Sequence, residues 1–331
     1  MDAVWLAKLN ERGMLRASFV PPTQIRQLRD YTRLRSDLIT ERSRHIQRVE
    51  KLLEDALIKL SSVATNMMGV SGRAMIEALI AGERDPQVLA EMAKGRLRIK
   101  RAALVEALTG RFDAHHGELA SVLLSQIDGL SAQIEHLDVR IEEMIADMPE
   151  AAAPPATVDA DGVILAPAGL AAVDRLDEIT GIGRHAAQVI IAEVGLSMAV
   201  FPTAANLVSW AKLSPRTIQS GAKTRAGKTG KGNRYLKSVL GEAAASAAKT
   251  RTFLGARYRR LAKRIGKLPA LVAIARSILV IVWQLLADPT SRYHDLGPDF
   301  FANRIQPERR KLQHIHQLEA LGYTVTLTPA A

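Results

Sequence analysis

Apolar residues recur every three or four positions through residues 23–63 and again through residues 115–148, with charged residues between them. We expect one long helix in each segment. In the second segment the spacing alternates between three and four without a break, which is a heptad repeat typical of a coiled coil. Its members are Ala120, Leu123, Ile127, Leu130, Ile134, Leu137, Ile141, Met144 and Met148. We therefore predict an antiparallel coiled-coil arm formed by the two helices, and a core helix of a compact bundle remains the alternative.

The rest of the sequence predicts a mainly α fold whose helices are separated by proline and glycine residues. Residues 2–20 read as helical and stop at Pro21-Pro22, and residues 149–170 are rich in proline and alanine and read as a linker. Further helices are expected at about 72–82, 86–110, 171–178, 184–194, 203–212, 234–248, 251–265, 269–287 and 307–321. A short strand is expected at Tyr323–Leu327.

Composition places the chain among ordinary globular proteins, since 47% of its 331 residues are hydrophobic and 24% are charged. Cysteine is absent, which excludes a disulfide framework and cysteine-based zinc sites. The most apolar stretch, Leu268–Ala287, contains Arg276 and is expected to be a buried core helix rather than a membrane span. Because Asp2, Lys8 and Glu11 interrupt the start, we expect no signal peptide. The core-helix interpretation implies no membrane contact, and the absence of cysteine fits a cytoplasmic location.

Positive charge is concentrated in residues 201–270, which hold sixteen lysines and arginines and one acidic residue, Glu242. This window carries +15, whereas the whole chain carries +11. Glycines cluster in the same window, and glycine lets a backbone approach a phosphate closely. The expected partner is a polyanion, namely nucleic acid. The candidate contacts are Gly221, Lys223, Arg225, Lys228, Lys231, Arg234, Arg257, Arg260 and Lys263.

A second candidate phosphate site lies at Gly181-Ile182-Gly183, between two predicted helices. This pattern resembles a helix-hairpin-helix, whose second helix offers backbone amides to a DNA phosphate without reading sequence. Gly181, Gly183 and Arg184 would make the contact. The alternative is a plain helix corner in the core, capped by Gly183.

Other chemistries are disfavoured by spacing. The segment 221–229 has five residues between Gly221 and Gly227-Lys228-Thr229, whereas a Walker A loop has four, and no apolar strand precedes it. Adjacent His115 and His116 are expected to point apart as surface residues. His314 and His316 lie two apart on a predicted helix and are also expected to face different ways. Scarce aromatic residues, at 4%, disfavour base-stacking platforms.

The segment LVSWAKLSPRTIQSGAKTRAGKTGKGNRYLK resembles the C-terminal domain of one group of insertion-sequence transposases. These are the IS-one-ten / IS-one-sixteen group, which have a RuvC-like nuclease domain with four acidic residues and a catalytic serine. They are related to Piv-type invertases and are described as bridge-RNA-guided recombinases. The start of the chain, GIGRHAAQVIIAEVG and the tail LEALGY fit the same group, so the resemblance runs the whole length.

The resemblance implies that Ser220 is the nucleophile, which attacks a DNA phosphate and holds the strand as a phosphoserine ester. It implies that Lys223, Arg225, Lys228, Lys231 and Arg234 stabilise the developing charge. The alternative is that Ser220 is an ordinary turn serine. Ser214, which precedes Pro215, is interpreted as a turn residue.

The family's acidic tetrad binds Mg²⁺, and only Asp2 matches it, as the last member. One carboxylate cannot hold a metal pair, so we expect an N-terminally truncated copy that does not bind Mg²⁺ by itself. The expected domains are a nuclease remnant at 1–20, the helical arm at 21–148, a linker at 149–170, the transposase domain with helix-hairpin-helix and serine loop at 171–290, and a tail at 291–331.

Three functions remain open from the sequence. The first is a transposase or site-specific recombinase that binds DNA and a structured guide RNA, exchanges strands through Ser220 and assembles through the arm as a dimer or tetramer. The second is an inactive, truncated relic that only binds nucleic acid and oligomerises. The third is a basic RNA-binding or ribosome-associated protein, which would form no covalent DNA adduct.

Overall fold

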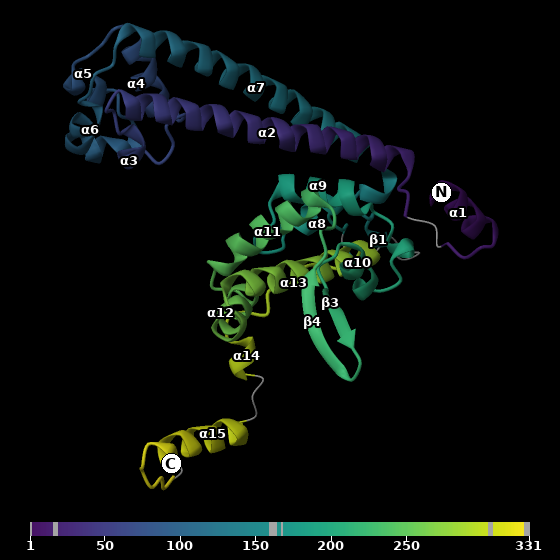
Figure 1. The fold of residues 1–331 in the computed structure, drawn as a ribbon. Coiled ribbons are helices and arrows are strands. Elements are labelled where there is room, and N and C mark those ends of the chain that lie inside the picture. The colour runs from purple at the N-terminus through teal and green to yellow at the C-terminus, as the bar shows by residue number, and fades with distance from the viewer. Residues whose placement is uncertain (1, 16–18, 159–163, 167, 304–306, 328–331) are drawn as a thin grey trace. The chain divides into compact units, whose positions relative to one another are not determined.

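The computed structural model describes the chain except residues 1, 16–18, 159–163, 167, 304–306 and 328–331. Over the described residues the fold is mainly helical, as predicted, with two small antiparallel sheets of two strands each (Figure 1). The chain divides into two compact units. Residues Asp30–Met144 form the inserted unit, and Met1–Arg29 together with Ile145–Ala331 form the main unit.

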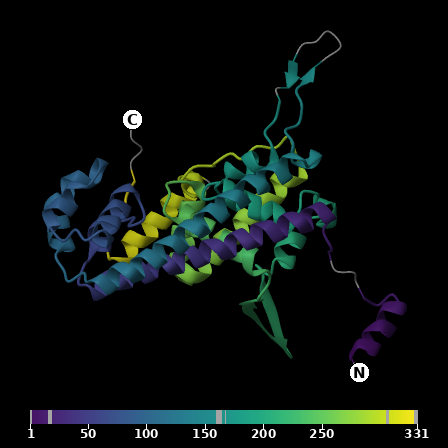
Figure 2. The ribbon, with the colours of Figure 1, turned by 90° about the horizontal axis from the view of Figure 1, so that it is seen from above.

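The long helices are α2 (Thr23–Asp55) and α7 (Ala114–Ala146). Within the inserted unit they lie side by side (Figure 1, Figure 2). Arg35 Nη1 lies 2.8 Å from Asp138 Oδ1. Seven residues further along α2, Arg42 Nη1 lies 3.5 Å from Ser131 Oγ, seven residues back along α7. The two helices are therefore antiparallel, and their polar contacts repeat with the heptad.

One half of the predicted heptad seam on α7 is fully buried, at Ala120, Ile127, Ile134 and Ile141. The other half is less regular, because Leu124 rather than Leu123 is the buried residue there. The facing side of α2 buries Arg35, which is 1% exposed, and this burial lowers the pKa of its guanidinium. Helix pairing is observed, while the coiled-coil assignment and the pairing of this arm with a second chain stay predictions.

Short helices close the far end of the inserted unit around a core that includes Leu53, Met75 and Leu104. The prediction of one helix over 23–63 is wrong at its end, because Leu57 adopts φ 61 and the chain turns there. The prediction of one helix over 86–110 is also wrong, since Gly95 adopts φ 57 and breaks it. The elements are α3 (Leu60–Val63), α4 (Val70–Ile80), α5 (Pro86–Glu91), the 3₁₀ helix η1 (Gly95–Lys100) and α6 (Arg101–Leu108).

The main unit is built around α13, which packs against α8, α10, α11 and α12. By length and composition α13 is the one helix of the described chain that could cross a membrane, with a mean hydropathy of 2.2. It buries Ile274, Ile278 and Val282 among the other helices, so the predicted core helix is confirmed. The helices are α1 (Asp2–Glu11), η2 (Pro149–Ala151), α8 (Ala172–Asp177), α9 (Arg184–Val194), η3 (Met198–Val200), α10 (Ala204–Trp210), α11 (Arg234–Ala248), α12 (Phe253–Ile265), α13 (Lys267–Ala287), α14 (Phe300–Asn303) and α15 (Pro307–Ala320).

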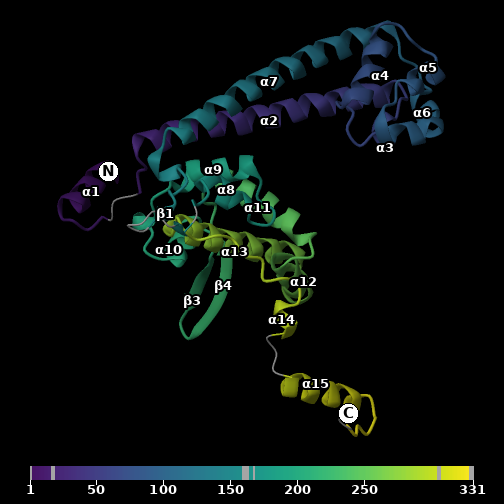
Figure 3. The ribbon, with the colours of Figure 1, turned by 180° about the vertical axis from the view of Figure 1, so that it is seen from behind.

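The strands lie where the sequence predicted none. The presumed linker contains β1 (Thr157–Val158) paired with β2 (Ile164–Ala166). The basic segment forms a longer antiparallel hairpin of β3 (Pro215–Ser220) and β4 (Lys223–Thr229), which projects from the helices of the main unit (Figure 3). The strand predicted at Tyr323–Leu327 is wrong: these residues are irregular, because a strand needs a hydrogen-bonded neighbour and none pairs with them in the described chain.

Candidate nucleic-acid interface and serine hairpin

Ser220 is the last residue of β3 and stands directly before the hairpin turn. Its partner across the ladder is Lys223, so the turn consists of Gly221 and Ala222. Gly221 adopts φ 60, and an added Cβ would meet nothing within 4 Å. Glycine is the usual first residue of a II′ hairpin turn because it tolerates positive φ without cost. The predicted glycine-rich loop is therefore a tight hairpin, which gives Ser220 a defined position.

The serine and the turn are open to solvent. Every residue of β3 is exposed, and so are Gly221 and Lys223. Among the described contacts, the Ser220 hydroxyl bonds to no protein group. An exposed hydroxyl beside a lysine can approach a phosphate, whereas a buried turn serine could not. Arg225 and Lys228 follow on the backbone of β4, but the placement of their side chains lies outside the described part of the chain.

The strand before Gly221, β3, is exposed rather than apolar, and the Walker A interpretation fails. In that motif the loop leads into a helix whose amides bind phosphate. Here the turn leads into β4 instead. The segment is a two-stranded ribbon rather than a nucleotide cradle.

The base of the hairpin is fixed to the helices by close backbone contacts. Lys237 Nζ of α11 donates to the Gly230 carbonyl at 2.6 Å. Gly232 adopts φ 60, and a Cβ there would lie 2.7 Å from the carbonyl oxygen of Ala211. Lys231 and Arg234 are exposed on either side of this junction. The Arg234 guanidinium lies over the Tyr235 ring, 4.5 Å from its centroid.

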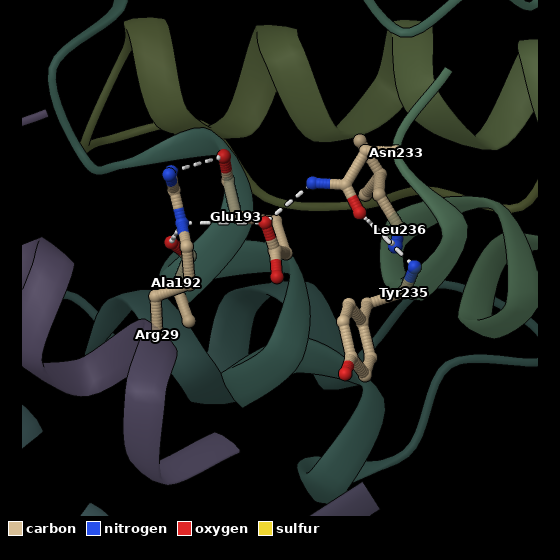
Figure 4. A network of polar contacts seen from close by, with 6 residues as sticks. All are labelled: Arg29, Ala192, Glu193, Asn233, Tyr235 and Leu236. Carbon is tan, nitrogen blue, oxygen red and sulfur yellow. Dashed lines mark hydrogen bonds and ion pairs between the residues drawn. The ribbon is translucent and has the colours of Figure 1, made fainter. Parts of the chain in front are cut away.

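Glu193 is the functional candidate that the sequence analysis missed. It is 0% exposed on α9, and Arg29 Nε lies 3.3 Å from its Oε2. Asn233, which precedes α11, donates from Nδ2 to the same oxygen and accepts from the Tyr235 and Leu236 amides through Oδ1 (Figure 4). A glutamate inside the apolar run Ile190-Ile191-Ala192-Glu193-Val194 was the available signal, since a buried acid requires partners.

The helix-hairpin-helix candidate forms two helices, α8 and α9, joined by a tight turn. Gly181 adopts φ 94, and its missing side chain allows the turn to approach α11, where a Cβ would lie 2.3 Å from the Ala243 carbonyl oxygen. Gly183 is exposed and caps α9 without a side-chain hydrogen bond. Within 4 Å a Cβ there would meet Asp177 Oδ1, at 3.9 Å, so the N-terminus of α9 is exposed but has a carboxylate beside it. Phosphate binding at this turn remains a prediction.

Arg184, predicted to bind phosphate beside this turn, forms an ion pair with Asp174 at 3.0 Å. Both side chains are about half exposed, at 54% and 47%. Exposed pairs of this kind contribute little and exchange readily. Asp174 partly neutralises the charge of Arg184, and the Arg184 side chain stays about half exposed to solvent.

The predicted cations on α12 divide into two kinds. Arg260 and Lys263 are exposed, and the Arg260 guanidinium stacks on the Phe301 ring at 3.9 Å, which restricts its direction. Arg257 is half-buried, and burial followed by repulsion from Arg260 and Arg276 lowers its pKa. The outer face of α12 also exposes Arg259 and Arg264, which the sequence analysis did not single out.

A cluster of possible metal ligands lies in the inserted unit, at Asp113, His115 and His116. The prediction that the two histidines point apart is wrong, since their ring centroids are 3.8 Å apart and His116 is buried. His116 Nδ1 accepts from the amide of Asp113, the residue before α7, and Nε2 lies 3.4 Å from Oδ2 of Asp55, the last residue of α2. The ring therefore connects the start of α7 with the end of α2. Magnesium prefers oxygen ligands, and a group with two imidazoles does not fit it.

The carboxylate assigned to the acidic tetrad, Asp2, is the first residue of α1, but its side chain lies outside the described part. Over the described residues, no oxygen-rich cluster fits a Mg²⁺ pair.

Family models match two parts of the chain. A family model described as transposase of the IS116/IS110/IS902 family matches residues 173–259, which span α8 to α12 and include the serine hairpin. A model for DEDD transposases of the IS110 type matches residues 1–58. Among curated proteins, none matches the chain. The two family matches show that the chain belongs to the insertion-sequence transposases of the IS110/IS116/IS902 family.

Proposed function

We propose that this transposase binds DNA along the serine hairpin and α12 and exchanges strands through a phosphoserine ester on Ser220. The observation that carries the proposal is the exposed hydroxyl of Ser220 at the turn of a cation-rich hairpin, opposite Lys223. The +15 charge of residues 201–270 supports an attractive field for the DNA backbone.

In the proposed step the Ser220 oxygen attacks a phosphorus atom of the DNA backbone. The new bond joins Oγ to phosphorus, the bond from phosphorus to one deoxyribose oxygen breaks, and the serine proton leaves to solvent while the departing oxygen takes up a proton. A deoxyribose hydroxyl of another strand then reverses these events and releases Ser220. Lys223 and Lys231 stabilise the charge on the phosphate oxygens, and the ester conserves the bond between the two steps.

Two further parts of the proposal rest on the family resemblance. A structured guide RNA would select the DNA target by base pairing. Two or more chains would assemble through α2 and α7. Self-association is supported by apolar side chains that α7 leaves exposed, Leu119, Val122 and Val139.

The test is a comparison of wild type with Ser220→Ala on DNA that carries the ends of the element. Wild type should form a protein–DNA ester that survives denaturing electrophoresis. The alanine variant should form none, while its DNA affinity changes by less than about twofold because alanine removes only one exposed hydroxyl. Equal ester levels in both proteins would remove Ser220 from the mechanism. DNA binding by wild type without any ester would favour the inactive, nucleic-acid-binding alternative.

A further inference from the structure

The carboxylate of Glu193 joins three elements of the main unit. It is buried on α9, and Arg29 neutralises it at 3.3 Å. The same guanidinium donates to the carbonyl oxygens of Ala192 and Glu193, at 3.1 and 2.9 Å, where α9 ends. A buried carboxylate is unfavourable unless it is paired and hydrogen-bonded, so each partner of Glu193 is held in a narrow range of positions.

Asn233 uses both ends of its side-chain amide. Its Oδ1 accepts from the amides of Tyr235 and Leu236 at 3.0 and 3.2 Å, which caps α11. Its Nδ2 donates to Glu193 Oε2 at 2.5 Å (Figure 4). Capping alone does not require this, because Thr203 and Thr252 cap α10 and α12 with a hydroxyl. The additional bond reaches from the cap of one helix to a buried charge on another.

The chain position of Asn233 links these bonds to the serine hairpin. Asn233 directly follows Gly232, whose backbone fits against Ala211, and the Gly230 carbonyl accepts from Lys237. The exit of β4 is thus attached to α10, α11 and, through Asn233, α9. Moving Asn233 would change the direction in which the hairpin leaves the helices.

We infer that Asn233 is a positioning residue for strand exchange: by joining the α11 cap to the buried Glu193–Arg29 pair, it fixes the serine hairpin so that Ser220 meets the phosphate in the reactive orientation. The inference rests on the proposed function of Ser220. Misplacing a reacting group by about 1 Å can reduce a rate on the order of a hundredfold, so the loss of one bond at the hairpin base is enough to slow ester formation at Ser220.

The experiment reverses the polarity of the Asn233–Glu193 bond. Asn233→Asp keeps a capping oxygen but places a second carboxylate against Glu193. Glu193→Gln removes the charge but can keep both contacts, because Arg29 and Asn233 donate to the same atom, Oε2, and the glutamine oxygen can take its place. In the double variant the second carboxylate is gone, and the glutamine amide nitrogen, placed where Oε2 lies, can donate to the aspartate, while Arg29 keeps its bonds to the carbonyl oxygens of residues 192 and 193. Asn233→Thr keeps an uncharged cap without the amide donor and serves if the charged variant does not fold.

Two measurements are made on each variant. Hydrogen exchange at residues 229–236 in DNA-free protein should become at least tenfold faster in Asn233→Asp and Asn233→Thr and recover in the double variant. The rate of ester formation at saturating DNA should fall about tenfold or more in the two Asn233 single variants, while the DNA concentration for half-maximal rate stays within about twofold, and the double variant should regain most of the rate. Asp85→Asn, a conservative cap change on α5, is the control and should alter neither.

The two measurements separate the inference from the proposed function. If wild type forms no ester, the chemistry assigned to Ser220 fails, and the exchange data still decide whether Asn233 holds the hairpin. Unchanged exchange in both Asn233 single variants would overturn the inference. So would faster exchange combined with an unchanged rate of ester formation, or a double variant no better than Asn233→Asp.

Discussion

Gly181 and Gly183 lie in one turn, but the structure gives them different roles. At Gly181 a Cβ would lie 2.3 Å from the Ala243 carbonyl oxygen, and φ is 94. Gly181→Ala should therefore lower the free energy of unfolding by about 3 kcal/mol, measured by chemical denaturation. Gly183 has φ −116, and a Cβ there would meet Asp177 Oδ1 at an ordinary contact distance of 3.9 Å, so Gly183→Ala should cost less than about 1 kcal/mol.

The same pair tests phosphate binding at the turn. A methyl group at residue 183 stands beside the N-terminus of α9, where a phosphate would approach the backbone amides. If the turn binds DNA, Gly183→Ala weakens binding to duplex several-fold while stability is nearly retained. Unchanged affinity in this variant would mean that the turn only connects two packed helices and does not bind phosphate.

Asp288 provides a pH-dependent prediction. Hydrogen bonds from the Thr290 hydroxyl, the Thr290 amide and the Ser291 hydroxyl lower its pKa from 3.8 to about 2. Because the folded pKa is depressed, the turn after α13 is favoured above pH 3.8, and this contribution is lost as the pH falls towards 2. Nuclear magnetic resonance of the Asp288 carboxyl should show a midpoint near pH 2, and a midpoint close to 3.8 would show that these bonds are absent in solution.

The pair of Glu193 and Asn233 shows what the sequence could not supply at this scale. The two residues are forty positions apart, and their contact depends on how α9 and α11 pack. The sequence marks Glu193 only as an acid in an apolar run. Its partner follows from three-dimensional packing, and periodicity contains no information about it.

At the scale of elements, the serine hairpin shows why periodicity missed a strand. A half-buried strand alternates apolar and polar residues, but β3 is exposed at every position, so neither face carries a hydrophobic pattern. The Gly221-Ala222 turn also lacks the Asn-Gly or Asp-Gly signature of common hairpins. The sequence indicated a basic, glycine-rich loop, whereas the hairpin geometry of its backbone could not be predicted.

The hairpin also gives a quantitative test of its charge. If Lys223 and Lys231 each contact a phosphate, replacing both with glutamine should reduce the slope of log affinity against log salt by about 1.8 for duplex DNA. Fluorescence anisotropy over a salt series measures this slope. Replacing Lys51 and Lys59, exposed lysines of the inserted unit, removes the same charge and is the control. An equal reduction in both variants would mean that net charge rather than the hairpin carries the effect.

The long helices were the most predictable elements. Prolines at 21 and 22 directly precede the start of α2, and the predicted heptad, which ends at Met148, runs two residues past the observed end of α7 at Ala146. Helices α9 and α11 begin and end as predicted, at 184–194 and 234–248. The errors fall at left-handed residues, Leu57 and Gly95, where one backbone angle ends a helix whose side-chain pattern continues. Periodicity reports which face is buried and does not report φ.

At the scale of the whole molecule, charge and cores are distributed unevenly. The basic window lies entirely within the main unit, and the residues outside that window are slightly acidic, at −4. Each unit has its own buried core, around Ile76 in one and Ile278 in the other. The basic residues proposed to bind nucleic acid thus lie on a unit whose buried core is distinct from that of the inserted unit.

Separate cores predict that the two units unfold in separate transitions. Ile76 and Ile278 are each 0% exposed, so replacing either with alanine should cost about 2–5 kcal/mol through lost contacts and a cavity. In differential scanning calorimetry Ile76→Ala should lower only the transition of the inserted unit, and Ile278→Ala only that of the main unit. Hydrogen exchange at each melting step identifies the unit that opens. If both substitutions lower a single shared transition by similar amounts, the units unfold as one cooperative body, and DNA binding in the main unit would then be sensitive to every core mutation in the inserted unit.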